Sequence, residues 1–271
     1  MRINTNLNAM IATNQMTKNT ALAGNSMEKL STGLRITKAG DDAAGLAVSE
    51  KMRAQIRGME QAERNVQDGI SMVQTAEGAL EEAGNIAQRM RELGVQAGND
   101  TLSAEDRTKV KEELKQLQDE MKKISEETKF NGKQLLTSTA AGQTFTIQAG
   151  ANSETRTITT ANLSSIANGL STITISSSAQ AQSFVENVDK ALTSINDARS
   201  ALGAMQNRLE YTSNNLTTTT ENLTAAESRI RDVDVAKEMV TLSKLNILNQ
   251  ASQAMVSQAK QQPESVSQLL R

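Results

Sequence analysis

Apolar residues recur at alternating steps of three and four through residues 181–233, and this row constrains the fold more than any other feature of the chain. Only Thr212 and Thr219 interrupt it. A spacing of about 3.5 residues keeps one stripe of a helix facing a partner helix, which is the condition for coiled-coil packing. At about 1.5 Å per residue, this helix would extend roughly 80 Å. The members of the row are Ala181, Phe184, Val188, Ala191, Ile195, Ala198, Leu202, Met205, Leu209, Thr212, Leu216, Thr219, Leu223, Ala226, Ile230 and Val233.

Two further long helices are predicted before this one. Residues 43–97 carry a similar seam, and Gly98-Asn99 behind them supplies a C-cap, because Gly and Asn tolerate the left-handed conformation. Ser103-x-x-Asp106 then forms a capping box for the next helix. The short turn between the two helices makes them antiparallel neighbours. The two seams comprise Met59, Val66, Ile70, Val73, Leu80 and Ala87, and then Val110, Leu114, Leu117, Met121 and Ile124.

A small β insert is predicted between the third helix and the long row. Asn131-Gly132 is a hairpin-type turn dipeptide. The segments Thr144–Gln148, Thr155–Thr160 and Ser171–Ser176 alternate β-branched and polar residues, as short half-buried strands do. With 1 Pro and aromatic residues at 1%, the rest of the chain favours helices packed along narrow seams. We therefore expect a mainly α protein: an elongated helical rod with antiparallel coiled-coil or helix-bundle packing, paired terminal helices and a small β-hairpin insert.

The chain has neither His nor Cys, which removes most catalytic chemistry. No imidazole base, thiol nucleophile, disulfide or thiolate metal site is possible. Adjacent carboxylates such as Glu81-Glu82 lie off the apolar seams, and we interpret them as a solvated face. Asp232-x-Asp234 begins like a calcium loop, but Ala236 stands at the third ligand position. We expect no enzymatic activity, no cofactor and no metal.

The overall charge and hydropathy exclude two more classes of partner. A net charge of -2 and a pI near 5.5 give no electrostatic reason to expect nucleic acid. No apolar run approaches the ~18 residues of a membrane span, and the first residues lack the apolar stretch of a cleaved secretory signal. The sequence predicts no membrane insertion, and either a cytoplasmic protein or one exported without a cleaved leader.

Both ends of the chain are poor in charge yet amphipathic. Between Ile3 and Met27 the only charged residue is Lys18, and between Met239 and Pro263 there are only two. The polar faces of these segments carry Asn and Gln, whereas membrane-surface helices usually carry many Lys and Arg. We therefore predict that the terminal helices contact other subunits and are disordered in the free monomer. The candidate interface residues are Ile3, Leu7, Met10, Ile11, Met27, Leu30, Leu34, Leu245, Leu248, Met255, Val266 and Leu269.

Several segments resemble bacterial flagellins, in order and from end to end. They are the start Met1–Asn6, then Glu28–Arg35 (EKLSTGLR), Ala39–Arg53 (AGDDAAGLAVSEKMR), Gln88–Gln96 (QRMRELGVQ), Phe130–Leu136 (FNGKQLL), Ala201–Leu209 (ALGAMQNRL), Asn222–Met239 and Gln253–Arg271. The resemblance covers about residues 1–150 and 180–271. It implies a structural subunit, exported by the flagellar type III pathway, that polymerises into the extracellular filament used for swimming.

The same resemblance implies a division of the chain. Residues 1–40 and 234–271 would form inner-tube helices, residues 41–136 and 179–233 the two halves of an outer tube, and residues 137–178 a short variable insert. The implied partners are further copies of the chain, an export chaperone, the filament cap and the hook-junction proteins. The alternative is a hook–filament junction protein or another type III-exported helical structural protein.

A second site is carried over from the family. The segment that resembles the one recognised by the flagellin-sensing Toll-like receptor contains Arg89, Leu93 and Gln96, and Glu113 aligns with a nearby contact. Lateral packing between subunits is an equally good interpretation of these four residues.

Overall fold

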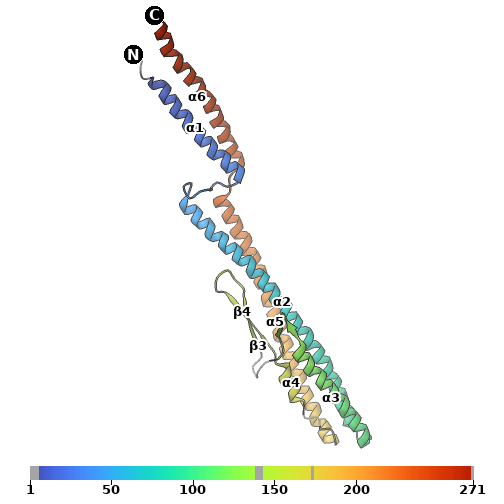
Figure 1. Cartoon of the computed structure of the whole chain (residues 1–271). Coiled ribbons are helices and arrows are strands. Elements are labelled where there is room, and N and C mark those ends of the chain that lie inside the picture. The colour runs from blue at the N-terminus through green and yellow to red at the C-terminus, as the bar shows by residue number, and fades with distance from the viewer. Residues whose placement is uncertain (1–5, 138–142, 172–173, 270–271) are drawn as a thin grey trace. The chain divides into compact units, whose positions relative to one another are not determined.

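The computed structural model describes residues 6–137, 143–171 and 174–269, with side chains as far as Gln261. Helices make up most of it (Figure 1). The elements are α1 (Leu7–Thr32), α2 (Ala43–Ala97), α3 (Ala104–Glu127), β1 (Lys129–Phe130), β2 (Lys133–Gln134), β3 (Gln143–Gln148), β4 (Thr155–Thr160), α4 (Leu163–Gly169), α5 (Ser178–Arg231) and α6 (Val235–Leu269). The expected mainly α fold with a small β-hairpin insert is confirmed.

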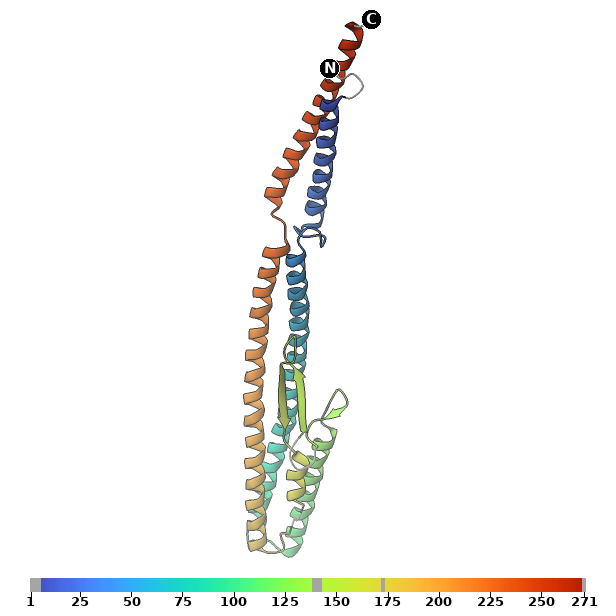
Figure 2. The same ribbon diagram turned by 90° about the vertical axis from the view of Figure 1, so that its left-hand side faces the viewer.

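The chain divides into two compact units. One unit comprises residues 1–54 and 222–271, and holds α1 paired with α6. The other comprises residues 55–221, and holds α3, α4, the strands and most of α2 and α5. In both views α1 runs beside α6, so the expected pairing of the terminal helices is confirmed (Figures 1 and 2).

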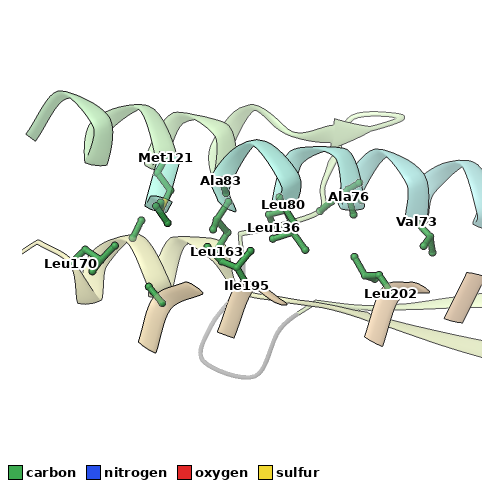
Figure 3. Packing of buried hydrophobic residues seen from close by; sticks show 14 of the residues in the cluster. Val73, Ala76, Leu80, Ala83, Met121, Leu136, Leu163, Leu170, Ile195 and Leu202 are labelled. Atoms are coloured by element: carbon green, nitrogen blue, oxygen red, sulfur yellow. The ribbon is translucent and has the colours of Figure 1, made fainter. Parts of the chain in front are cut away.

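The 55–221 unit is built around the predicted seams. Side chains of α2 face those of α5, and α3 and α4 close the core from the other sides (Figure 3). Because the seam positions recur every three or four residues, each helix presents one continuous apolar stripe. The buried stripe residues include Val66, Val73, Leu80, Ala87, Val110, Leu114, Met121, Phe184, Val188, Ile195, Leu202, Leu209 and Leu216.

The helix ends follow their predicted signals with one exception. α2 runs from Ala43 to Ala97, and Asp42 accepts a hydrogen bond from the Gly45 backbone N–H at 2.8 Å. The expected left-handed cap at Gly98-Asn99 is wrong, because within the described residues a positive φ occurs only at Gly33, Asn131 and Gly132. The Gly98 N–H instead donates to both the Gly94 and Val95 carbonyls, at 3.1 and 3.2 Å, so α2 ends in a tightened last turn.

The insert was predicted in part. Asn131 and Gly132 have φ of 48° and 77°, the geometry of a primed hairpin turn between β1 and β2. β3 and β4 pair antiparallel, from Gln143 opposite Thr160 to Gln148 opposite Thr155. The predicted strand at Ser171–Ser176 is wrong for the described residues 171 and 174–176, which have no strand structure.

The short helix α4 was not predicted from the sequence. Its N-cap is Asn162, whose side chain accepts from the Ser165 backbone N–H at 2.9 Å. Leu163 and Ala167, four residues apart, are buried against the core. Seven residues are too few for a helical period to show in the sequence, so packing rather than propensity defines this element.

Inside the unit of residues 1–54 and 222–271, backbone hydrogen bonds join the end of α1 to the segment between α5 and α6. Gly33 ends α1 in the left-handed conformation, with φ of 72°. The Arg35 N–H donates to the Arg231 carbonyl at 2.6 Å, and the Val233 N–H donates to the Gly33 carbonyl at 3.0 Å. Arg231 also reaches Glu50 on α2 at 2.5 Å. Together these bonds hold the segment after α1 against the segment between α5 and α6, and they tie the end of α5 to the beginning of α2.

Candidate functional site

The face of α1 that packs on α6 is small and polar. The residues of α1 that are buried or half-buried recur at steps of three and four, as in a coiled-coil seam. Most are Ala, Asn or Ser, and the most deeply buried are Asn19 and Ser26, at 4% and 5% exposed. The seam of α1 comprises Ala9, Ala12, Met16, Asn19, Ala23, Ser26 and Leu30.

The facing seam of α6 mixes Leu and Val with small and polar residues. It has Leu245 at 8% exposed and Ser252 at 3% exposed, with Asn249 half-buried between them. Two hydrogen bonds cross between the helices: Asn6 donates to the Ala259 carbonyl at 2.6 Å, and Thr20 donates to the Asn249 side chain at 3.4 Å. The seam of α6 comprises Leu242, Leu245, Asn249, Ser252, Val256 and Ala259.

Many large apolar side chains of both helices lie exposed, outside the seam that joins α1 to α6. Leu7, Ile11 and Met27 are 60%, 59% and 64% exposed on α1. On α6, Ile247 and Met255 are 63% and 58% exposed. Among the described side chains of the two helices, the exposed large apolar residues are Leu7, Met10, Ile11, Leu22, Met27, Val235, Met239, Val240, Ile247, Leu248 and Met255.

The predicted interface residues therefore separate into groups. Leu7, Met10, Ile11, Met27, Leu248 and Met255 are exposed, Leu30 and Leu34 are half-buried, and Leu245 is buried in the seam. Ile3 and the side chains of Val266 and Leu269 lie outside the described part of the chain. Sequence reasoning missed the exposed Leu22, Val235, Met239, Val240 and Ile247, although the charge-poor context around Leu22 and Ile247 was a usable signal.

A shallow groove opens between the two helices near the start of α1. Apolar Ile11 and Met255 and neutral polar Gln15 and Gln258 are among its lining residues, with Asn8, Ala12 and Ala259 completing it. None of the seven carries a charge, so the groove suits an apolar or neutral polar surface rather than an ionic ligand.

The second candidate site lies at the packing of α2 against α3. Arg89 on α2 bonds Glu113 on α3 at 3.0 Å and Glu92 on its own helix at 3.0 Å. Glu92 first, and then Glu113, raise the pKa of the Arg89 guanidinium. Gln96 is exposed on the same helix.

Leu93 does not share this surface. It is 2% exposed and belongs to the core cluster of the 55–221 unit. Its place in the proposed recognition surface is corrected accordingly, because a side chain buried in the core offers no surface to a partner.

The residues that the structure describes contain no cluster of three or more acidic side chains placed to hold a metal ion. Across the same described ranges, no helix has the length and apolarity needed to cross a bilayer.

An exposed apolar face on paired helices defines a class: helical structural proteins that associate through that face. Two family models place the chain within this class. "Bacterial flagellin N-terminal helical region" matches residues 3–141, and "Bacterial flagellin C-terminal helical region" matches residues 185–270. The chain belongs to the bacterial flagellin family.

Relatives match over their full lengths. The chain is 53% identical to the flagellin of Halalkalibacterium halodurans over 274 residues, covering 100% of both chains. It is 48% identical to the flagellin of Bacillus subtilis over 304 residues, and 46% identical to a 33 kDa flagellar filament core protein of Treponema phagedenis over 286 residues, each again with 100% of both chains covered.

Solved structures agree with the fold. The crystal structure of Bacillus cereus flagellin is 36% identical, with a TM-score of 0.52 over 60% of this chain and 94% of that one. A flagellar hook-associated protein of Vibrio parahaemolyticus has a TM-score of 0.60 over 71% of this chain and 100% of that one, but at 12% identity it shows the fold alone.

Family membership settles the function at the level of the molecule. The chain is a structural subunit of the bacterial flagellar filament, and it polymerises with copies of itself. The hook–filament junction alternative is not favoured, because the full-length relatives at high identity are flagellins and filament core proteins.

Proposed function

We propose that the exposed apolar faces of α1 and α6 are the surface through which copies of this chain polymerise. The observation that carries this proposal is the exposure of large apolar residues on both helices: Leu7, Ile11, Met27, Ile247 and Met255 are all more than half exposed, whereas Asn19, Ser26 and Ser252 are buried between the helices. A second copy of the chain fits such a face, because it offers the same apolar surface in return.

Burial provides the driving force. Each 100 Å² of apolar surface removed from water contributes about 2.5 kcal/mol. The exposed set spans both helices, so contacts with several neighbouring copies would exceed the cost of association. The scarcity of charge in the same segments lowers the desolvation penalty that covering them would bring.

The direct test places one charge on this face. Ile11→Glu and Met255→Glu each bury an unpaired carboxylate in the proposed contact, which costs several kcal/mol. We expect either variant to stay in the supernatant under polymerising conditions, at least about tenfold below wild type in pelleted filament, since 1.4 kcal/mol is already a factor of ten. Sedimentation and electron microscopy are the measurements.

Thr157→Glu is the matched control, because Thr157 is exposed on β4 and the family resemblance places the insert away from the polymer contacts. It should form filaments normally. Circular dichroism should show the same thermal transition for all three variants, since none touches the 55–221 core. Normal filaments from Met255→Glu would refute the proposal.

We also propose that Arg89, Gln96 and Glu113 form a recognition surface for the flagellin-sensing Toll-like receptor or a lateral contact between subunits. The exposed ion pair that joins α2 to α3 supports it, because its geometry holds both charges in place. Arg89→Asp should weaken monomer signalling through the receptor and filament yield alike. Unchanged monomer signalling would remove the receptor from the proposal.

The remaining parts of the proposal concern export and partners. The chain acts as structural material without catalysis, leaves the cell through the flagellar type III pathway, and meets an export chaperone, the filament cap and the hook-junction proteins on the way. The composition supports these proposals, because a chain without Cys and with 1 Pro refolds after export without disulfides and with a single X-Pro bond that could isomerise slowly.

A further inference from the structure

The α1–α6 seam has a polar centre. Asn19 is 4% exposed, and it accepts a hydrogen bond from Gln15 one turn earlier, at 3.4 Å. Asn249 is half-buried on α6 and accepts from Thr20 at 3.4 Å. Deep burial of an amide in a helix–helix seam costs stability, so this placement calls for a reason.

The two asparagines lie in one layer. The bonds from Asn6 to Ala259 and from Thr20 to Asn249 fix an antiparallel register for the pair. In that register the seam residues Asn19 and Asn249 face each other across the helices. By the same spacing, Ala23 faces Leu245 one layer further along.

Elsewhere this seam specifies its register poorly. Most of its other layers pair a small residue with one larger residue, and a shift by one heptad would bring Asn19 opposite Val256 in place of Asn249. The seams of the 55–221 unit differ, since Val66, Leu80 and Ile195 have shapes that interlock. A buried asparagine pair is the device by which coiled coils fix register at the expense of stability.

We propose that Asn19 and Asn249 form a polar layer that sets the register of α1 against α6 and keeps the isolated pair from being stable by itself. The terminal helices then lock in the correct register only when their outer faces are covered. The claim that covering the outer faces locks the helices rests on the proposed polymerisation through those faces. The claim that the polar layer sets the register does not.

The test replaces the layer with apolar residues in the full-length chain. Asn19→Leu combined with Asn249→Leu is compared with Asn14→Leu combined with Asn246→Leu, which makes the same change at exposed positions of the same helices. Because the chain has no Cys, introduced thiols report on one pair alone. Ala23→Cys with Leu245→Cys reports the native register, and Ala23→Cys with Ser252→Cys reports a shift of one heptad.

In filaments treated with a short thiol-to-thiol cross-linker, the native-register product should exceed the shifted product by about tenfold in the wild-type and control backgrounds, the ratio that ~1.4 kcal/mol of register preference supplies. In the double-leucine background this ratio should fall towards one. The unassembled double-leucine chain should also gain helical circular dichroism signal, and the control should not.

An unchanged cross-linking ratio would overturn the register role, and an unchanged or lower helical signal in the unassembled double-leucine chain would overturn the weakening role. Filament formation by the Ile11 and Met255 variants tests the outer face independently. The two proposals can therefore fail separately.

Discussion

Two glycines of α2 have opposite surroundings. A Cβ at Gly58 would lie 2.8 Å from the Ala151 Cβ and 3.1 Å from its Cα, so the turn after β3 depends on the missing side chain. A Cβ at Gly78 would meet nothing within 4 Å. The sequence alone does not distinguish them, because neither residue's neighbours along the helix reveal which one lies under the hairpin.

We expect Gly58→Ala to lower the free energy of unfolding by about 1–2 kcal/mol through overpacking against Ala151. Gly78→Ala should raise it by ~0.5–1 kcal/mol, because alanine loses less backbone entropy in a helix. Urea unfolding of the unassembled chain measures both. Equal effects of the two substitutions would show that the hairpin does not rest on α2 at Gly58.

At the scale of elements, sequence periodicity specified the long helices and the hairpins but not the terminal faces. The bounds of α2, the seam of α5 and the Asn131-Gly132 turn follow from local signals that agree with packing. In α1 and α6 the apolar stripe predicted contacts with other subunits, and it did not show which residues the two helices bury against each other. Size ranking predicts that Ile11 and Met255 are buried within the chain, whereas Asn19 and Ser252 are buried there instead. In a subunit of a polymer, large apolar residues can be exposed on the single chain, because they are buried only where neighbouring subunits meet.

At the start of α3, the predicted capping box of Ser103 and Asp106 is confirmed. The Ser103 hydroxyl accepts from the Asp106 N–H at 3.2 Å and donates to its carboxylate at 2.7 Å. The hydrogen bond from the Ser103 hydroxyl to the carboxylate, followed by the one from the Ser103 backbone N–H, holds the pKa of Asp106 below its ordinary value. A depressed folded-state pKa stabilises the fold above the unfolded pKa and loses that effect as the pH falls through the folded one.

Asp106→Asn should therefore destabilise the chain at pH 7, and its difference from wild type should shrink as the pH falls below 3.8, the ordinary value of the carboxyl. Denaturant unfolding at pH 7 and at acid pH gives the comparison. Asp119→Asn, an exposed position further along α3, serves as the control and should show no such convergence. A gap for Asp106→Asn that persists at acid pH would exclude the cap as its source.

At the scale of the whole molecule, the core belongs to one unit. The core cluster runs from Ala62 to Leu216, inside residues 55–221. In the described part of the other unit, the buried apolar residues are Ile36 and Leu245, beside four buried polar ones. This division follows from the sizes of the residues in the α1–α6 seam and in the seams of the 55–221 unit. In the sequence, only the scarcity of charge at the two ends indicated it.

Hydrogen exchange on the unassembled chain should follow the same division. Amides of α2, α3 and α5 between residues 55 and 221 should exchange slowly, since opening them exposes the core. Those of α1 and α6 should exchange rapidly, and become protected on polymerisation as the outer faces are covered. A fragment of residues 55–221 provides the reference, because its slow amides should match those of the intact chain. Strong protection of both terminal helices before assembly would mean that the seam alone stabilises them, and that polymerisation adds copies without ordering the chain.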